Sequence, residues 1–366
     1  MRPNCPQQQR IPVSLSARRV ASFQYLSVGL AINKRSTATL AVPDLKEIVM
    51  IQAHLDALHG LPAFDFPAAG ATDSALPAAG AVAWRISVEP YSDDSEEFSE
   101  AWARFVEKVD LSAVQALIIG QWGESYEVNS SSIVELVVEQ RHRLTSLRAL
   151  FLADITQEQQ EISWIQQSDV TPVLGAFPEL VEFGIRGGTE LQFPETGHAA
   201  LRRLTIESGG LPAAVVHGVS SSNFPALEFL DLWLGTDNYG GDATIEDLAV
   251  ILGGTKLPSL RHLGLRNSEI QDDIAKAIVT APILGQLTTV DLSMGTLSDD
   301  GAQALLDTSS FKGLEFLDLH YHFLSDAAIT ELTRHCAELG VRVDLSEQTD
   351  ADEYDDEICR YVAVSE

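Results

Sequence analysis

One recurring pattern of apolar residues constrains the fold of this chain more than any other feature. Apolar side chains fill positions 1, 4 and 6 of a short motif, as in Leu227, Leu230 and Leu232. Side chains alternate along a β-strand, so positions 4 and 6 face one side and positions 3, 5 and 7 face the other. Copies of the motif begin at Val114, Leu147, Leu180, Leu201, Leu227, Leu260, Leu287 and Leu314, and a degenerate copy begins at Gly340.

The spacing of these copies averages about 28 residues, within the ~20 to 29 residues typical of leucine-rich repeats. Helical stretches are expected between the motifs, at residues 131–144, 157–167, 243–252, 270–279, 298–307 and 325–337. Each strand-plus-helix unit can bury its leucines only against its neighbours, so one repeat would not fold alone. The sequence therefore predicts an α/β leucine-rich-repeat solenoid, a horseshoe of about nine strand–helix repeats, over residues 113–346.

The two ends of a solenoid need caps, because an end repeat would otherwise expose its apolar face to water. Residues 50–112 are expected to form an N-terminal strand–helix cap, with Ile51, Leu55 and Leu58 at helical spacing, a strand at 82–88 and a helix at 92–109. Residues 347–366 are expected to form an acidic tail and a C-terminal capping segment, in which residues 360–365 add an edge strand.

Residues 1–49 differ from the rest in charge. They carry seven basic and two acidic residues, a charge of +5, whereas residues 50–366 carry 17 basic and 51 acidic residues, a charge of −34. We interpret the segment as a disordered basic leader, or as an extension that precedes a true start at Met50. The alternative is a targeting peptide, because Arg18 and Arg19 precede an uncharged stretch.

The whole chain of 366 residues has a formal charge of −29. Phosphate binding needs a basic face, so this charge argues against nucleic-acid and anionic-membrane partners. It favours a protein partner with a basic surface, although acidity can also serve solubility alone. No run reaches the ~20 apolar residues of a membrane-spanning helix. Three scattered cysteines predict neither a disulfide framework nor a thiolate metal site, which is typical of the cytoplasm.

Two predicted helices begin with a leucine, a serine and an aspartate, at Leu297–Asp299 and Leu324–Asp326, with the serine placed as N-cap. This pattern after a leucine-rich strand resembles the long-repeat, ribonuclease-inhibitor class of leucine-rich-repeat proteins. Over about residues 50–366 the chain is also similar to an uncharacterised family of bacterial leucine-rich-repeat proteins. The similar segments are 59–62 (HGLP), 64–66 (FDF), 161–167 (EISWIQQ), 239–242 (YGGD) and 360–366 (RYVAVSE). The resemblance implies a bacterial cytoplasmic protein with no established activity.

Positions 3, 5 and 7 of the later repeats should line the concave face of the sheet, where they are expected to be exposed. Position 5 collects aspartates, and positions 3 and 7 add aromatic, histidine and arginine side chains, a mixture typical of protein-binding hot spots. The predicted partner-binding residues are Phe229, Asp231, Trp233, His262, Arg266, Asp291, Phe316, Asp318 and His320. The alternative is that aspartate simply suits position 5, where neighbouring polar residues can pair with it.

The segment 235–242 lengthens its repeat and is a second candidate contact surface, because long insertions on a rigid scaffold tend to carry binding function. Its candidate residues are Asp237, Asn238, Tyr239 and Asp242. Two aspartates and an asparagine beside glycines could surround a hard cation such as calcium. The spacing does not match the twelve-residue calcium loop, and a loop that caps the next helix is the simpler interpretation.

The sequence holds no phosphate loop, zinc-protease helix motif or nucleophile elbow. We therefore expect no enzyme, no cofactor and no metal site, and a scaffold or regulator that binds a protein partner on the concave face. The alternative function is an accessory subunit that binds a small molecule or metal ion at the same face or at the 235–242 loop. A wide, flat face would favour the protein partner, and a closed pocket at the loop would favour the ligand.

Overall fold

The computed structural model describes residues 52–71, 75–91, 96–307, 311, 313–354 and 357–366. The expectations for residues 1–49 and for Ile51 lie outside this range. Twelve strands form one sheet in sequence order, parallel throughout except for the antiparallel pair β1–β2. They are β1 (Ala57–Leu58), β2 (Leu61–Asp65), β3 (Ala83–Ile86), β4 (Ala116–Ile119), β5 (Ala149–Leu152), β6 (Glu182–Arg186), β7 (Arg203–Glu207), β8 (Phe229–Gly235), β9 (His262–Ser268), β10 (Thr289–Asp291), β11 (Phe316–Asp318) and β12 (Arg342–Asp344).

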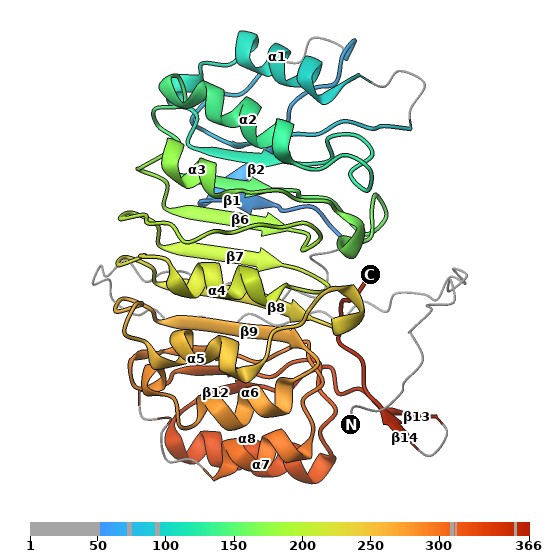
Figure 1. The fold of residues 1–366 in the computed structure, drawn as a ribbon, viewed down its shortest axis with the longest axis vertical. Coiled ribbons are helices and arrows are strands. Elements are labelled where there is room, and N and C mark those ends of the chain that lie inside the picture. The colour runs from blue at the N-terminus through green and yellow to red at the C-terminus, as the bar shows by residue number, and fades with distance from the viewer. Residues whose placement is uncertain (1–51, 72–74, 92–95, 308–310, 312, 355–356) are drawn as a thin grey trace, which may run out of the picture.

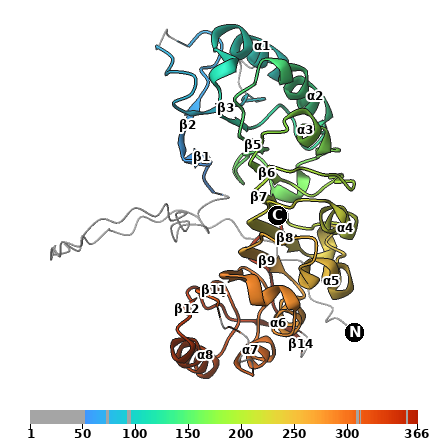
Figure 2. The same cartoon turned by 90° about the vertical axis from the view of Figure 1, so that its left-hand side faces the viewer.

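Helices follow most of these strands and lie on one side of the sheet, so that the chain forms a stack of strand–helix units (Figure 1). Figure 2 shows that the stack curves, with the helices on the outer side and the strands on the inner side. The α-helices are α1 (Phe98–Lys108), α2 (Ser131–Glu139), α3 (Thr171–Ala176), α4 (Ala213–Ser221), α5 (Ile245–Gly253), α6 (Gln271–Ile278), α7 (Asp299–Leu306) and α8 (Asp326–Leu339). A mixed α/β fold with one long parallel sheet is therefore confirmed.

The core lies between the sheet and the helices and is built from positions 4 and 6 of the motif. Leu230 pairs with Leu263, Leu263 with Val290, and Val290 with Leu317, so that equivalent residues stack in register. These side chains are at most 1% exposed. Burying each contributes roughly 1.5 to 3 kcal/mol, and each depends on the next repeat for its cover.

The leucine–serine–aspartate pattern joins neighbouring repeats. Ser298 caps α7, and its backbone N–H and hydroxyl donate to the Asp272 carboxylate of the preceding repeat at 2.8 and 2.6 Å. Ser325 caps α8, and its backbone N–H donates to Asp299 at 2.8 Å. The serine thus caps its own helix, while the aspartate of the preceding repeat satisfies the backbone N–H group of the cap.

The expected helix around Leu55 and Leu58 is wrong. Leu58 ends β1 and pairs with Leu61 of β2 across a two-residue turn. His59 and Gly60 in that turn have φ of 55° and 71°, the left-handed pair that a tight hairpin requires. The hairpin covers the inner face of the first strands, since Leu55, Leu58 and Leu61 pack on the apolar side chains of Ala83, Ala116, Ile118, Ala149 and Phe151.

The expected helix at 157–167 is also wrong, because only a short 3-10 helix, Ile162–Trp164, forms there. The backbone N–H groups of Gln166 and Gln167 donate instead to the carbonyls of Ser125 and Thr189 in other repeats. Conversely, α3 and α4 were not expected. Valines that lower helix propensity, with Gly218, obscure α4 in the sequence.

The C-terminal segment does not extend the long sheet as an edge strand. Residues 352–354 and 357–359 form a separate antiparallel pair, β13 (Asp352–Tyr354) and β14 (Glu357–Cys359). Cys359 is disulfide-bonded and Cys336 is a buried free thiol, so one cysteine is paired in a chain for which sequence analysis expected no disulfide framework. Among the described residues, no helix has the length and apolarity needed to cross a membrane.

Candidate partner-binding surface

Three of the four aspartates at position 5 accept a local hydrogen bond at the end of their strand. Oδ1 of Asp291 accepts the backbone N–H of Ser293 at 3.0 Å, Asp318 accepts that of His320 at 3.0 Å, and Asp344 accepts that of Ser346 at 2.9 Å. Each carboxylate therefore closes the turn that follows its strand, a role that favours aspartate or asparagine. This supports the interpretation that aspartate recurs because it suits the repeat.

Arg266 occupies the middle of a buried polar cluster on the inner face. Its Nη1 lies 3.4 Å from Oδ2 of Asp231 and 3.3 Å from Oδ2 of Asp291, and its guanidinium stands 5.3 Å from the Trp233 ring. Burial alone would raise the pKa of Asp291, but the charge of Arg266, the neighbouring His262 and the hydrogen bonds from Ser293 together hold that pKa below its usual range. The cluster is thus anchored by an ionised pair.

Asp318 and His320 form a second pair beside this cluster, with Oδ1 to Nδ1 at 2.7 Å. Burial and the charge of Asp291 raise the pKa of Asp318. The pKa of His320 is raised overall. Burial alone would lower it, but the hydrogen bond to Asp318 and the charge of that carboxylate together have the larger effect. Among the described residues, Nε2 of His320 has no partner.

Sequence analysis correctly brought these residues to one face, but six of the nine are not exposed. Trp233 is 1% exposed, Arg266 2% and Asp291 3%, and Asp231, Asp318 and His320 are all below 9%. Trp233 is covered because Ile162 and Met294 pack on it together with Ala363 and Val364 of the C-terminal segment. A partner approaching this conformation would meet Phe229, His262 and Phe316, which are half-buried.

These three belong to a row of position-3 side chains that stand in register on seven consecutive strands. We call this set the inner-face row: Glu182, Arg203, Phe229, His262, Thr289, Phe316 and Arg342. Six are half-buried and Arg342 is exposed. The row is thus the part of the predicted site that remains open at the surface.

Stacked rings and guanidinium groups hold the inner-face row in place. The Phe229 and His262 rings stack with centroids 3.9 Å apart, and the Arg203 guanidinium lies 3.7 Å from the Phe229 centroid. At the other end, the Arg342 guanidinium lies 5.0 Å from the Phe316 centroid. Burial lowers the pKa of His262 to about 4, so its ring is neutral near pH 7. Preordered aromatic surface of this kind suits protein recognition.

Two of the residues proposed for binding in the 235–242 loop, Tyr239 and Asp242, make hydrogen bonds within the protein. Asp242 accepts the backbone N–H of Ala213, the first residue of α4, at 2.7 Å, so it caps the helix of the preceding repeat. Tyr239 donates its hydroxyl to Glu366. Asp237 and Asn238 are exposed. The expectation that the loop ends in a cap for the helix from Ala243 is therefore wrong for Asp242, because the N-cap of α5 is Thr244.

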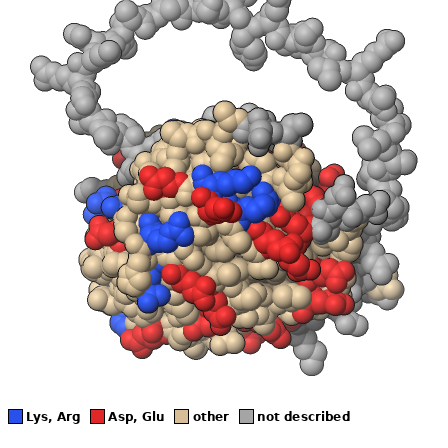
Figure 3. All heavy atoms as spheres, turned by 90° about the horizontal axis from the view of Figure 1, so that it is seen from above, with Lys and Arg blue, Asp and Glu red and all other residues tan. Residues whose placement is uncertain are grey.

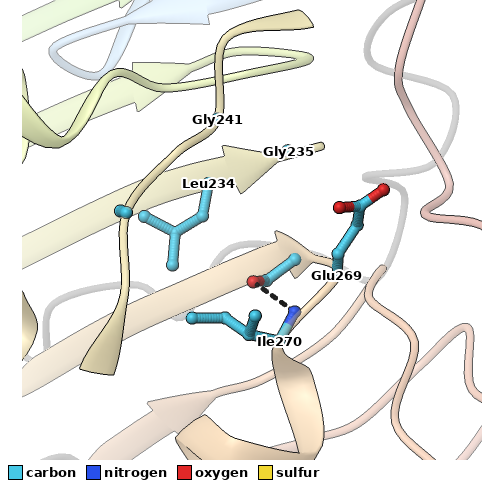
Figure 4. Close-up of a pocket in the computed structure, with 7 residues that line it drawn as sticks. Leu234, Gly235, Gly241, Glu269 and Ile270 are labelled. Atoms are coloured by element: carbon cyan, nitrogen blue, oxygen red, sulfur yellow. Dashed lines mark hydrogen bonds between the residues drawn. The ribbon is translucent and has the colours of Figure 1, made fainter. Parts of the chain in front are cut away.

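A small hollow lies beside this loop, lined in part by Leu234, Gly241 and Glu269 (Figure 4). Ser268 also lines the hollow, and its hydroxyl accepts the backbone N–H of Ile270 at 3.2 Å. The hollow has a volume of about 10 Å³, room for a single water. A small-molecule ligand would need this loop to move. Within the described residues, no group of three His, Cys, Asp or Glu side chains could hold a metal ion.

Sequence analysis missed a second buried ionic cluster, on the earlier strands. Nε of Arg186 lies 2.6 Å from Glu207, and Asp154 lies 2.7 Å from Nε of Arg85 and 3.6 Å from Nη1 of Arg186. Arg186 and Glu207 stand at position 7, in register with each other, as Trp233 and Arg266 do. Extending the position-7 column toward the N-terminus would have found them.

No family model and no curated protein matches the chain. Among solved structures, a Bacteroides fragilis protein determined in a structural-genomics programme is 33% identical over 68% of this chain and 70% of that chain, with a TM-score of 0.65. An internalin from Listeria monocytogenes is 15% identical over 65% of this chain and 56% of that chain, with a TM-score of 0.35. A likeness at that lower score does not establish a shared fold.

Proposed function

The chain belongs to the same family as the Bacteroides fragilis protein, and from that premise we propose that it is a leucine-rich-repeat scaffold that binds a protein partner on its inner face. In this proposal the nine strands from β4 to β12 each begin one leucine-rich repeat, β6 and β12 without a following helix, and the cap formed by β1, β2, β3 and α1 precedes them. The chain catalyses no reaction and needs no cofactor.

The observation that carries this proposal is the inner-face row. It places phenylalanine, histidine and arginine side chains in register over seven adjacent strands, partly exposed and already stacked on one another. Parallel strands lie about 4.8 Å apart, so the row extends for roughly 29 Å. A surface of that length fits a protein better than a small molecule, which is usually bound in a concave pocket.

The partner we propose has a basic surface and is neither a nucleic acid nor a membrane. Residues 50–366 carry a charge of −34, which would attract a basic protein and repel phosphate groups. Acidic and basic side chains both occur on the end of the stack formed by α1 (Figure 3), so the attraction would be local rather than uniform. We place the complex in the cytoplasm.

A pair of matched double variants tests the proposal. Phe229→Ala with Phe316→Ala removes two rings from the inner-face row, whereas Val250→Ala with Leu339→Ala removes two exposed side chains from the outer helices. The full chain and both variants are used as bait in an extract of the source cells. We expect a basic protein to be recovered with the unaltered chain and with the helix variant, and at least about ten-fold less with the row variant.

The same experiment can reject the proposal. Recovery of the same proteins in the same amounts by the row variant, with its circular dichroism unchanged, would show that the inner face is not the binding surface. Loss of the partner with the helix variant alone would move the site to the outer helices.

A further inference from the structure

The C-terminal segment Tyr361–Glu366 lies across the ends of several strands and is held mainly through its backbone. The Tyr321 hydroxyl donates to the carbonyl of Tyr361 at 3.2 Å, and the backbone N–H of Ala363 donates to the carbonyl of Met294 at 2.8 Å. These contacts come from the turns after β11 and β10. The segment therefore crosses the repeats rather than belonging to any one of them.

Asn267, near the end of β9, makes two hydrogen bonds to the backbone of one residue of the segment, Val364. Its Nδ2 donates to the carbonyl of Val364 at 2.6 Å, and its Oδ1 accepts the backbone N–H of Val364 at 3.0 Å. Asn267 itself has φ of 52°, a left-handed conformation that asparagine tolerates better than most residues. An amide that pairs with both backbone groups of one residue recognises an extended peptide whatever its side chain.

Side-chain contacts add selectivity for small residues. Ala363 and Val364 pack against Ile162, Trp233 and Met294, which are at most 1% exposed. The backbone of Ser365 lies close against Gly209, because a Cβ added at Gly209 would lie 2.3 Å from the carbonyl oxygen of Ser365. The site thus has room for a pair of small apolar side chains and a closely seated backbone.

The far end of the segment meets two further donors. The Ser163 hydroxyl donates to the carbonyl of Ser365 at 2.5 Å, and the Tyr239 hydroxyl donates to the Glu366 carboxylate. Burial and this carboxylate raise the pKa of Tyr239 to about 12, so the phenol remains a donor at any ordinary pH. An acidic residue two positions after the apolar pair is therefore part of what the site accepts.

We propose that these residues form a peptide-recognition site, which we call the tail site: Ile162, Ser163, Trp233, Tyr239, Asn267 and Met294. Its ligand class is an extended peptide with two small apolar residues, then a small polar residue and a carboxylate. The segment 361–366 is its ligand within the same chain, and a partner segment of the same chemistry binds by displacing it. The tail site shares no residue with the inner-face row, so either proposal can fail without the other.

The test uses the full chain and a fluorescein-labelled peptide that copies residues 360–366, followed by fluorescence anisotropy. Val364→Pro removes the N–H that Asn267 accepts and should release the segment, because proline has no backbone donor. Ser365→Pro is the matched control, because Ser365 is held through its carbonyl, which accepts the Ser163 hydroxyl and is kept in proline. We expect Val364→Pro to bind the peptide saturably, and the unaltered chain and Ser365→Pro to bind it at least about ten-fold more weakly.

A second substitution distinguishes specific peptide recognition by Asn267 from nonspecific binding to a surface exposed when the C-terminal segment is released. Asn267→Ala added to Val364→Pro should weaken peptide binding by about ten-fold, because two hydrogen bonds are lost. A scrambled peptide should not bind. If the folded Val364→Pro chain binds neither peptide, binds both equally, or is unaffected by Asn267→Ala, the tail site is not a peptide-recognition site. If Val364→Pro does not fold, Val364→Asp, which sets a charge against Trp233 and so releases the segment, replaces it. Failure of that chain to bind the peptide, or equal peptide binding with and without Asn267→Ala, would overturn the proposal.

Discussion

Nη1 of Arg266 lies 3.3 Å from Oδ2 of Asp291, and their side chains are only 2% and 5% exposed. Neither group can exchange its partner for bulk water in this conformation. Removing one member of a buried ion pair leaves an uncompensated charge, which is far more costly than losing a pair at the surface.

We therefore predict that Asp291→Ala lowers the free energy of unfolding by about 3 to 5 kcal/mol in urea denaturation. The control is Asp273→Ala, which breaks an exposed pair with Lys276 and should cost less than about 1 kcal/mol. Similar losses in the two variants would show that the Arg266 cluster contributes nothing beyond an ordinary surface contact.

The stability of the fold should fall in mild acid because of His262. Its pKa in the folded chain is about 4, below the usual 6.5, so unfolding takes up a proton between these values. The contribution is present above about pH 6.5 and is lost as the pH falls toward 4, by up to about 3 kcal/mol. His262→Phe keeps a ring against Phe229 and cannot titrate. Its urea midpoint should change less with pH over this interval, and an unchanged slope would contradict the assignment.

The link between repeats at the helix N-termini can be measured at Asp299. Asp299→Ala removes the acceptor for the backbone N–H of Ser325, and it should lower the free energy of unfolding by about 1 kcal/mol. Asp300→Ala is matched to it, since both aspartates are exposed in the first turn of α7. A loss that is equal in both variants would point to the helix dipole rather than to the link.

Calcium should leave the 235–242 loop unchanged. Asp242 is already engaged as the cap of α4, and the adjoining hollow holds about 10 Å³. We expect millimolar calcium to leave the thermal midpoint of unfolding within error. A rise in that midpoint that Asp242→Ala abolishes would favour the alternative of an ion site at the loop.

The repeat pattern predicted the architecture because it records a local rule that every unit obeys. Positions 4 and 6 fill the core from Leu117 to Leu317, and no long-range information is needed to see them. The errors arose where distant contacts decide local structure. The turn at His59 and Gly60 replaced a helix by a hairpin, and residues 157–167 followed hydrogen bonds to other repeats.

Sequence analysis predicted which residues share the inner face, but it wrongly expected all of them to be exposed. Alternation along the strands correctly grouped Asp231, Arg266 and Asp291 on the inner face. Nothing in the motif indicates that Ala363 and Val364, at least 130 positions later in the chain, would pack on Trp233. A clue was present, because the segments 161–167, 239–242 and 360–366, which carry the resemblance to a bacterial family, meet at the tail site.

The inner face as the partner-binding surface can be tested most directly by site-specific photocrosslinking. A benzophenone amino acid is placed at residue 316 in the inner-face row and, in a separate chain, at residue 250 on α5, where Val250 is 44% exposed. Illumination in the source cells should give one discrete heavier product from residue 316 and none from residue 250. A product from residue 250 alone, or none from either while both chains remain folded, would contradict the proposal that this protein works through the inner face of its sheet.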